Sequence, residues 1–469
     1  MKLAIVLFYL FALLVVGAWF ARRIKDSKSF LVADRGLPWY VSTGTIVATF
    51  MGAGSLIGAA GLAYKIGISA IWMDIGGVLA IVALAFFAGR IRRFEGLTTP
   101  EILGARFNLP TRLLAALIII AAETAIVGYQ IRAGGYVLNL AVGMDKDLGM
   151  VITAAFIIGY TMFAGMISVA YTDLIQGITI LVALLLGLPF VINAAGGMQN
   201  VASVLPVDRL SLTGSSLGEA MKVLFPTFCL VFVMQPIWQR VFACKDEKAS
   251  KRAVTASVPA LLVMISILAF IATLGSAIAP NLEDGGTIII YLATHVLPPF
   301  IGVILLCAAV AIIVSTGDSM LLSPASNIIN DVYLTYINPK ASEKTILLYT
   351  RVTVLALGLI AFMQIKFFPS ILAMVIYAYT MEGGLAPALI AAFYWKRATP
   401  AGGLACVASA GVTTVVWELL GQPFGLSTSF VTIGVSTVLL VFVSLLTPAP
   451  SAEKLSRFGE LESSEAGAR

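Results

Sequence analysis

The sequence predicts an all-helical integral membrane protein, on the evidence of its composition and its apolar segments. Its 469 residues are 59% hydrophobic and only 12% charged, and the mean hydropathy is +0.99. Soluble domains carry roughly 25% charged residues, so a soluble class is excluded. Apolar segments of about 20 residues, the length that crosses a bilayer as a helix, follow one another along the chain. Such segments form helices because lipid leaves no partner for free backbone groups.

About thirteen segments are predicted to span the membrane. They cover residues 3–21, 40–64, 69–89, 113–141, 149–168, 173–195, 220–242, 254–279, 298–325, 346–365, 369–394, 402–420 and 428–446. The first precedes Arg22-Arg23 rather than a small-residue cleavage site, so we interpret it as a retained helix and not a signal peptide. We expect residues 1–450 to form a single transmembrane domain. Residues 451–469 lack apolar periodicity and are expected to be a disordered cytoplasmic tail.

Lysine and arginine are distributed unevenly between the predicted loops. Loops on the cytoplasmic side of membrane proteins carry an excess of these residues. The rich loops hold Arg22, Arg23, Lys25, Lys28, Arg35, Arg90, Arg92, Arg93, Arg106, Arg112, Arg240, Lys245, Lys248, Lys251, Arg252, Lys340, Lys344, Lys396 and Arg397. We therefore expect a multi-pass protein of the plasma (inner) membrane with its N-terminus outside and its C-terminus in the cytoplasm. The net charge of +6 then reflects topology, and nucleic acid is rejected as a partner.

Two of the predicted helices are interrupted by residues that weaken helices. Segment 220–242 contains Pro226 and the pair Gln235-Pro236, and segment 40–64 contains five glycines. The two segments stand five helices apart, and interrupted helices in corresponding positions indicate a transporter with its binding site between two repeats. The alternative is that the glycines only permit close helix packing. They are Gly44, Gly52, Gly54, Gly58 and Gly61.

A cluster of polar side chains lies inside the apolar segment 298–325. It consists of Ser315, Thr316 and Asp318. Ionisable and polar groups at this depth face the protein interior and serve a function. Hard oxygen ligands suit a small cation such as Na+, which places the chain among ion-coupled transporters. The plain alternative for Ser315 and Thr316 is a hydrogen bond to a carbonyl of their own helix.

Six motifs in this order resemble those of the sodium/solute symporter family, which includes sodium/proline, sodium/galactose and sialic acid symporters. They are GLP at 36–38, GLTTPEILGARF at 96–107, YTDLIQ at 171–176, PIWQRVFACKDEKASKRA at 236–253, STGDSMLLSPASNIINDVY at 315–333 and APALIAAFYWKRATPAGG at 386–403. The resemblance covers nearly the whole chain. It implies a LeuT-type fold of two inverted five-helix repeats, at about 40–195 and 220–394, with one extra helix before them and two after.

The resemblance also implies a sodium site where the first core helix unwinds against the eighth. Its ligands would be the carbonyls of Ala48, Met51 and Ile312 and the hydroxyls of Ser315 and Thr316.

A second cation or proton site is implied at Asp173, Asp318 and Ser319. Family members with a clear second site often carry a hydroxyl where this chain has Asp318, which leaves the sodium stoichiometry open. Two nearby carboxylates could hold a second Na+, or one of them could be protonated. For Asp173 a helix N-cap is an equal alternative.

The substrate pocket implied by the resemblance is lined by Gly52, Ser55, Asp74, Gln130, Gln235, Trp238 and Tyr377. Glu123 is seven residues from Gln130 and so shares its helix face. Glu123 is expected to face the cavity or to pair with Arg132. Phe50 stands where the proline transporter carries an aspartate, which argues against a simple transfer of proline specificity.

The function favoured by these observations is sodium-coupled import of a small polar organic solute by alternating access. A proton-coupled transporter that uses Asp173 and Asp318 is an alternative, and a transporter-like membrane sensor is an alternative from another class. An enzyme is rejected, because the chain has one histidine and neither a nucleophile–base constellation nor a cofactor loop. The expected partners are the solute, Na+ and the lipid bilayer, and no obligate protein partner is evident.

Overall fold

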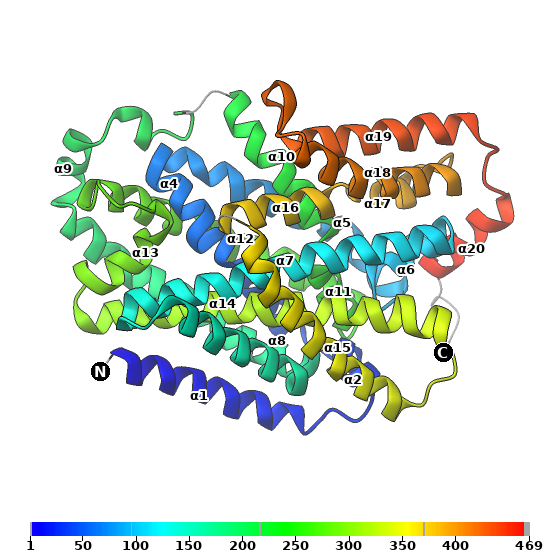
Figure 1. Ribbon diagram of the computed structural model, residues 1–469, viewed down its shortest axis with the longest axis horizontal. Coiled ribbons are helices and arrows are strands. Elements are labelled where there is room, and N and C mark those ends of the chain that lie inside the picture. Colours follow the sequence, from blue (N-terminus) through cyan, green and yellow to red (C-terminus); the bar gives the residue numbers. More distant parts are fainter. Residues whose placement is uncertain (1, 95, 215–216, 369–370, 464–469) are drawn as a thin grey trace.

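The computed structural model describes residues 2–94, 96–214, 217–368 and 371–463, and these form an all-helical bundle. The long helices run roughly along the longest axis of the molecule (Figure 1). We call the two ends of the bundle the α4 end and the α6 end. The first half of the chain contains α1 (Lys2–Ala21), α2 (Ser27–Val32), α3 (Trp39–Phe50), α4 (Ala60–Ile66), α5 (Trp72–Phe94), α6 (Thr99–Arg106), α7 (Leu109–Val142), α8 (Lys146–Ala194) and α9 (Gly197–Val204).

The second half repeats this kind of arrangement and adds helices at its C-terminal end. It contains α10 (Leu217–Val233), α11 (Gln235–Ala243), α12 (Glu247–Ile278), α13 (Ile288–Tyr291), α14 (Pro299–Asn327), α15 (Glu343–Gln364), α16 (Ile371–Gly383), α17 (Ala386–Tyr394), α18 (Pro400–Leu419), α19 (Thr428–Leu446) and α20 (Ala452–Ser463). Short 3₁₀ and π segments join these helices at η1 (Ala33–Arg35), η2 (Gly54–Ala59), η3 (Ile68–Ile71), η4 (Val207–Leu210), η5 (Gly285–Thr287), η6 (Leu292–Val296), η7 (Ile328–Ile337), η8 (Ile365–Phe367) and η9 (Pro423–Gly425).

Both predicted interruptions are present. The segment α3–α4 leaves the helical path at Met51, with φ −77° and ψ 83°, and bends by 49°. The segment α10–α11 leaves it at Met234, with φ −53° and ψ 104°, and bends by 41°. The second break lies directly before Gln235-Pro236, whereas Pro226 is accommodated inside α10. Each break frees backbone groups that a continuous helix would have paired.

The number of spans follows from how α8 is counted. Ten described helices are long and apolar enough to cross a membrane, and the two bent pairs bring the number to 12. α8 is one of the ten, although its 49 residues would extend about 74 Å as a straight helix. Gly165, with φ +57°, interrupts it near the predicted boundary between 149–168 and 173–195. Counted as two spans, α8 accounts for the thirteenth.

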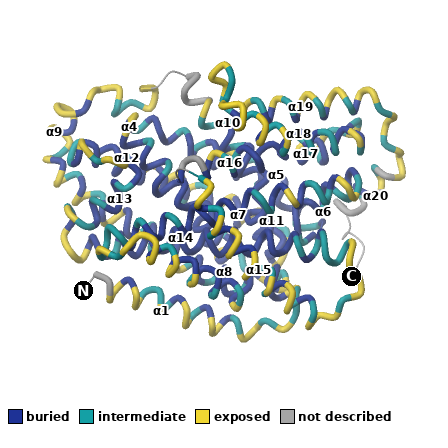
Figure 2. The backbone as a smooth tube through the Cα atoms, viewed as in Figure 1, coloured by how far each residue is buried: buried dark blue, intermediate teal, exposed yellow. Residues whose placement is uncertain are grey.

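The helices divide into a buried centre and a lipid-facing edge. In α14 and α7, 83% and 78% of the most apolar window is buried, against 22% in α1 and 33% in each of α15, α18 and α19. Figure 2 shows the same contrast between the centre of the bundle and its edges. The polar residues of α14 and α7 are therefore inside the protein, as side chains at this depth require.

The tail differs from the expectation. The predicted disorder after residue 450 is wrong for Ala452–Ser463, which form α20. Phe458 of this helix is buried against Phe94 of α5 and Phe393 of α17. A single aromatic anchor was not visible as apolar periodicity, which explains the error. Residues 464–469 lie outside the described residues.

Two arginines that the sequence analysis placed in cytoplasmic loops, Arg106 and Arg240, are instead buried. Arg106 ends α6 and is 1% exposed, and its guanidinium donates to the carbonyl oxygens of Trp395 and Lys396 at 3.1 and 3.3 Å. Burial lowers the pKa of this guanidinium. The helix α17 ends at Tyr394, so Arg106 satisfies carbonyls just past its end. Arg240 is the second case, and it belongs to the polar centre described below.

Candidate functional site

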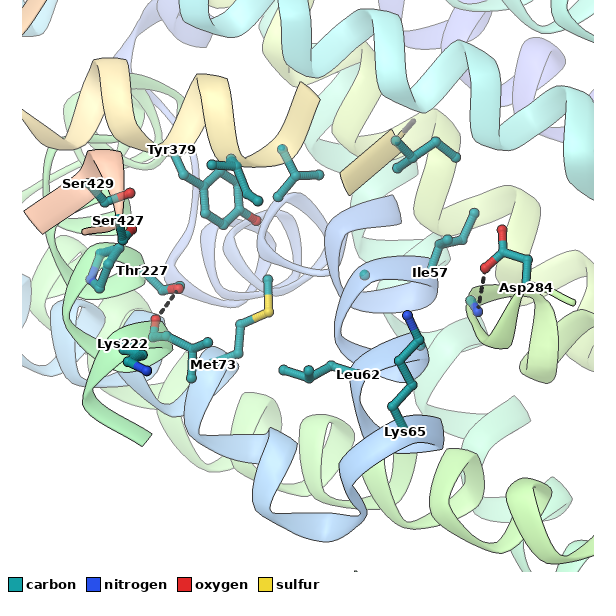
Figure 3. A pocket seen from close by; sticks show the side chains of 18 of the residues that line it. Ile57, Leu62, Lys65, Met73, Lys222, Thr227, Asp284, Tyr379, Ser427 and Ser429 are labelled. Atoms are coloured by element: carbon teal, nitrogen blue, oxygen red, sulfur yellow. Dashed lines mark hydrogen bonds between the residues drawn. The ribbon is translucent and has the colours of Figure 1, made fainter. Parts of the chain in front are cut away.

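A cavity of about 610 Å³ lies beside the first broken helix. This volume is in the range of small-molecule sites. Figure 3 shows Ile57 and Lys65 on one wall and Met73, Tyr379 and Thr227 across from them. Its charged lining residues are Lys65, Arg132, Lys222 and Asp284.

The break after α3 faces the middle of α14. The hydroxyl of Ser315 donates to the carbonyl oxygen of Ala48 at 3.0 Å and lies 3.3 Å from that of Ile312. The hydroxyl of Thr316 lies 3.5 Å from the carbonyl oxygen of Ala48 and 3.3 Å from that of Met51. The five residues predicted to surround one ion are therefore brought together.

Two features of this cluster were not predicted. The carbonyl oxygen of Thr49 also lies 3.2 Å from the hydroxyl of Thr316. Gly52 stands at the break itself, where an added Cβ would come within 2.8 Å of Gln130 Nε2 and 3.1 Å of Thr316. A residue with a side chain at this position would push the helices apart, so the glycine permits the close approach.

Two of the three residues predicted for a second cation site, Asp173 and Ser319, contact a buried arginine. Arg240 of α11 is fully buried, and its guanidinium pairs with Asp173 at 3.3 Å and donates to the hydroxyl of Ser319. Thr45 lies in the same group: it accepts from Arg240 at 3.0 Å and donates to Asp173 at 2.5 Å. The guanidinium thus supplies the positive charge between Asp173 and Ser319. The N-cap alternative for Asp173 is wrong, because this residue lies inside α8.

Asp318 lies apart from this ion pair. Its Oδ1 accepts from Thr161 of α8 at 3.2 Å, and its Oδ2 has no hydrogen-bond partner among the described residues. Asp318 is one position before Ser319 on α14, so the two side chains leave the helix about 100° apart.

Three of the residues predicted for the substrate pocket form hydrogen bonds with or within the first broken helix, although none of them lines the cavity itself. Ser55 donates to Asp74 at 3.1 Å, which joins the broken helix to α5. Gln130 Oε1 accepts from the backbone amide of Ala53 at 3.1 Å, so α7 satisfies one of the amides freed by the break. Met73 lines the cavity directly beside Asp74.

Trp238 and Gln235, two further residues predicted for the pocket, do not line the cavity. Trp238 is fully buried between Phe232 and Phe393, and its indole donates to the carbonyl oxygen of Phe232. Gln235 binds the backbone of Thr99 and Ser323 towards the α6 end. Both follow the second break, at which the chain bends by 41°.

Neighbours of the predicted residues line the cavity in some places. Tyr377 packs on Phe368, whereas Tyr379, two residues later and on the opposite helix face, lines the cavity. Tyr379 was missed because the family resemblance pointed to Tyr377, which lies about half a helical turn before it. Arg132 also lines the cavity and donates to the carbonyl oxygen of Phe368 at 2.9 Å, while both carboxyl oxygens of Glu123 lack hydrogen-bond partners among the described residues.

The α6 end is closed by a network of hydrogen bonds. Asp331 of η7 is fully buried and accepts from Arg112 at 2.7 Å and from Thr98 at 2.9 Å. The backbone amide of Thr99 donates to Gln235 at 3.2 Å. These bonds join α6, α7, α11 and η7, so the polar centre is covered on this side while the cavity lies on the other.

Comparisons with known proteins agree with this geometry. The model of the sodium:solute symporter family matches residues 30–409. The high-affinity proline transporter PutP of Bacillus subtilis is 28% identical over 474 residues, which cover 96% of this chain and 99% of the relative. A sodium/proline symporter of Staphylococcus aureus is 27% identical over 476 residues, which cover 95% and 92%.

Among solved structures, a Na+-coupled sialic acid symporter in a substrate-bound outward-open state superposes with a TM-score of 0.85 at 18% identity, over 96% of this chain and 98% of that one. Mhp1, a nucleobase-cation-symport-1 family transporter, superposes with 0.59 at 14% identity, over 92% and 98%. These likenesses confirm the predicted LeuT-type fold. The protein is a multi-pass membrane transporter, not an enzyme, and the chain belongs to the sodium:solute symporter family.

Proposed function

We propose that this chain couples the inward movement of Na+ to the import of a small polar organic solute by alternating access. The observation that carries the proposal is the meeting of the Ser315 and Thr316 hydroxyls with the carbonyls of Ala48, Met51 and Ile312. An ion bound about 2.4 Å from its oxygen ligands, as calcium is, sets neighbouring ligands about 3.4 Å apart. The distances of 3.0–3.5 Å between the paired oxygens fit such a shell.

The position of this site provides the coupling. Its oxygens come from the break after α3 and from α14, two elements that alternating access moves relative to each other. A bound ion stabilises the arrangement in which the two elements are close. Na+ therefore shifts the population towards the state whose cavity lies on the α4 side, and it prepares Gly52, Ser55 and Gln130 for solute.

A single Na+ is proposed for each transport cycle. The second site would require a cation between Asp173 and Ser319, where the Arg240 guanidinium lies. A buried carboxylate needs one compensating charge, and Arg240 supplies it without an ion.

The solute is proposed to bind in the cavity and to reach the neighbouring pair of Ser55 and Asp74. Lys65, Arg132 and Lys222 favour an anionic group on the solute, and Asp74 with Ser55 offers acceptors to an amine or hydroxyl deeper in. Proline is the first solute to test, since curated relatives are named for it. Phe50 argues for testing other amino acids and polyols as well, because its ring packs against Gly77 and is apolar.

We propose that the protein lies in the plasma (inner) membrane with its α4 end facing outside. The N-terminus is then outside, and α20 is in the cytoplasm. The helix α1 begins at one end of the bundle and α20 lies at the other, as an odd number of spans requires (Figure 1). Arg106 and Arg240 are buried and so do not count as loop charges. Without them, the loops at the α6 end still carry more lysine and arginine than those at the α4 end.

Uptake into proteoliposomes tests the proposal. Radiolabelled proline and a panel of amino acids and polyols are supplied with an inward Na+ gradient, or with K+ in its place. Uptake of at least one solute is expected to require Na+. Ser315→Ala and Thr316→Ala each remove one ligand and are expected to lower Na+-driven uptake at least tenfold at low Na+, with partial recovery at high Na+.

Thr350→Ala is the matched control, because Thr350 carries a fully buried hydroxyl that donates to the carbonyl of Ile346 in its own helix. This variant is expected to keep wild-type uptake. Equal uptake in K+ and Na+, or full Na+-driven uptake by both alanine variants, would contradict the proposed site.

A further inference from the structure

Part of the cavity wall is formed by the connection between α18 and α19, the two spans that follow α17. We call residues 420–429 the α18–α19 turn. Gln422, Ser427 and Ser429 of this turn line the cavity. Figure 3 shows both serines beside α10 on one side of the cavity. The match to the family model ends at residue 409, so this part of the wall lies beyond the segment on which the family assignment rests.

The turn is fastened to the helices that form the neighbouring parts of the wall. The hydroxyl groups of Ser429 and of Thr380 in α16 form a hydrogen bond of 2.6 Å, and both residues are buried. Thr380 directly follows Tyr379, which lines the cavity. The ring of Phe430 stacks on that of Phe225 in α10, with 6.0 Å between the ring centroids. Contacts with α10 and α16 therefore fix the start of α19 beside the cavity.

The backbone of the turn is held in a conformation that is unfavourable for its residues. Gln422 and Phe424 have φ angles of 56° and 61°, in the left-handed region that favours glycine. Glu418 at the end of α18 stabilises this conformation, because its carboxylate accepts from the side-chain amide of Gln422 at 3.2 Å and from the hydroxyl of Thr428. Strained residues of this kind are concentrated at ligand sites, where surrounding contacts hold them in place. The contacts of Glu418 thus fix Gln422 at the cavity.

Ser427 carries a hydroxyl that its own helix does not use. The residue directly precedes α19, where a serine commonly accepts from a backbone amide and so caps the helix. Its side chain makes no capping bond with the described residues of α19, and Ser427 lines the cavity instead. The hydroxyl is therefore placed to form a hydrogen bond with a polar group inside the cavity.

We propose that the α18–α19 turn recognises a carboxylate of the solute and so selects among solutes. This inference rests on the proposed binding of the solute in the cavity. The Ser427 hydroxyl and the Gln422 amide can donate to a carboxylate oxygen, and Lys222 of α10 lines the same cavity with a positive charge. Asp284, an acidic lining residue, lies on the opposite side and accepts from the backbone amide of Gly286 at 2.9 Å (Figure 3). The side formed by the turn therefore favours a carboxylate over a neutral amide.

Equilibrium binding to the purified full-length protein, in Na+ buffer and without a membrane gradient, tests this proposal. The probes are amino acids, proline among them, each paired with its carboxamide, together with polyols. In the parent, the amino acid that binds most tightly is expected to bind at least about tenfold more tightly than its carboxamide. Ser427→Ala is expected to reduce this preference about fivefold, because one donor to the carboxylate is lost. Ser427→Thr keeps the hydroxyl and should keep most of the preference.

Gln422→Gly separates recognition from folding. Glycine adopts the left-handed backbone without strain, so this variant should unfold at or above the parent temperature while its preference for the amino acid falls severalfold. Phe424→Gly relieves the same kind of strain at a residue outside the cavity lining, and it should keep the preference. Ser436→Ala is the control for Ser427→Ala, because Ser436 is a buried serine of α19 whose hydroxyl accepts from Ser409 at 3.3 Å.

Either of two results would overturn the proposal. The first is a parent that binds no amino acid of the panel, or binds none better than its carboxamide. The second is a preference that survives unchanged in both Ser427→Ala and Gln422→Gly, which would make the turn a passive support for the helices around it.

Na+ coupling is measured separately, by uptake, so the two proposals can fail independently. A parent that imports only polyols with Na+ would refute carboxylate recognition and leave the proposed symport standing. Uptake that needs no Na+ would refute the symport and leave the binding preference as measured.

Discussion

At the residue scale, Arg240 decides how the polar centre is neutralised. Sequence position alone put it with the loop arginines that set topology, since it is followed by Lys245, Lys248 and Lys251. The structure places its guanidinium at full burial between Asp173 and Ser319. The signal that could have found it is its distance from the break: Arg240 lies five residues after Gln235, still within the short helix α11.

Replacing this arginine by an apolar residue of similar length is expected to destabilise the protein strongly. Arg240→Met leaves Asp173 buried without its partner, and breaking a buried pair from one side costs about 3–5 kcal/mol. The double variant with Asp173→Asn should recover a large part of that loss, because the unpaired charge is then gone. Thermal unfolding of the purified protein gives both values.

Arg93→Met is the matched control, because the Arg93–Glu247 pair is 2.6 Å long but partly exposed on both sides. Exposed pairs contribute about 0–1 kcal/mol, so this variant should unfold close to the parent. Equal losses in Arg240→Met and Arg93→Met would show that the buried pair has no special role.

Site residues were predictable where a motif fixes both the residue and its helix. Ser315 and Thr316 lie on a continuous helix and face the glycine-rich break. Their position in the motif therefore predicted both the oxygen ligands and the helix that carries them. Trp238 and Tyr377 failed for a different reason. Their positions depend on how far α11 and α16 rotate about their axes. Trp238 packs on Phe393, which is distant in the sequence, and Tyr377 packs on Phe368, which lies outside α16.

At the scale of the elements, close helix contacts hold the two halves of the chain together. Gly76 of α5 faces the backbone of α10, where an added Cβ would overlap the carbonyl oxygen of Leu224. α5 follows the first broken helix, and α10 is the first half of the second. The sequence predicted both breaks from glycine and proline, yet it gave no signal for this contact, because Gly76 lies within an uninterrupted apolar helix.

Gly76→Ala is expected to destabilise the protein by about 1–3 kcal/mol, the usual cost of overpacking, in spite of the better helix propensity of alanine. Gly187→Ala in α8 provides the comparison, since a Cβ there meets nothing within 4 Å. It should leave stability unchanged or raise it by up to about 1 kcal/mol. A Gly76→Ala protein that unfolds at or above the parent temperature would mean that α5 and α10 are less closely packed than described.

At the scale of the whole molecule, the structure has its cavity on one side of the polar centre and a closed network on the other. Leu62 and Lys65 line the cavity, whereas Asp331, Arg112 and Thr98 join the elements at the α6 end. The membrane class, the two breaks and the inverted-repeat fold followed from composition and motif order. Which side is open could not be predicted, because one sequence encodes both states of an alternating-access cycle.

Accessibility of a cavity cysteine to a membrane-impermeant thiol reagent tests the central claim most directly. Leu62→Cys is labelled in Na+ and in K+, with the parent as background because its four cysteines are buried. We predict severalfold faster labelling in Na+, loss of that difference when Thr316→Ala is added, and its retention with Thr350→Ala. Labelling that is independent of Na+, or a Na+ effect that survives Thr316→Ala, would contradict a sodium site between α3 and α14 that drives the outward-facing state.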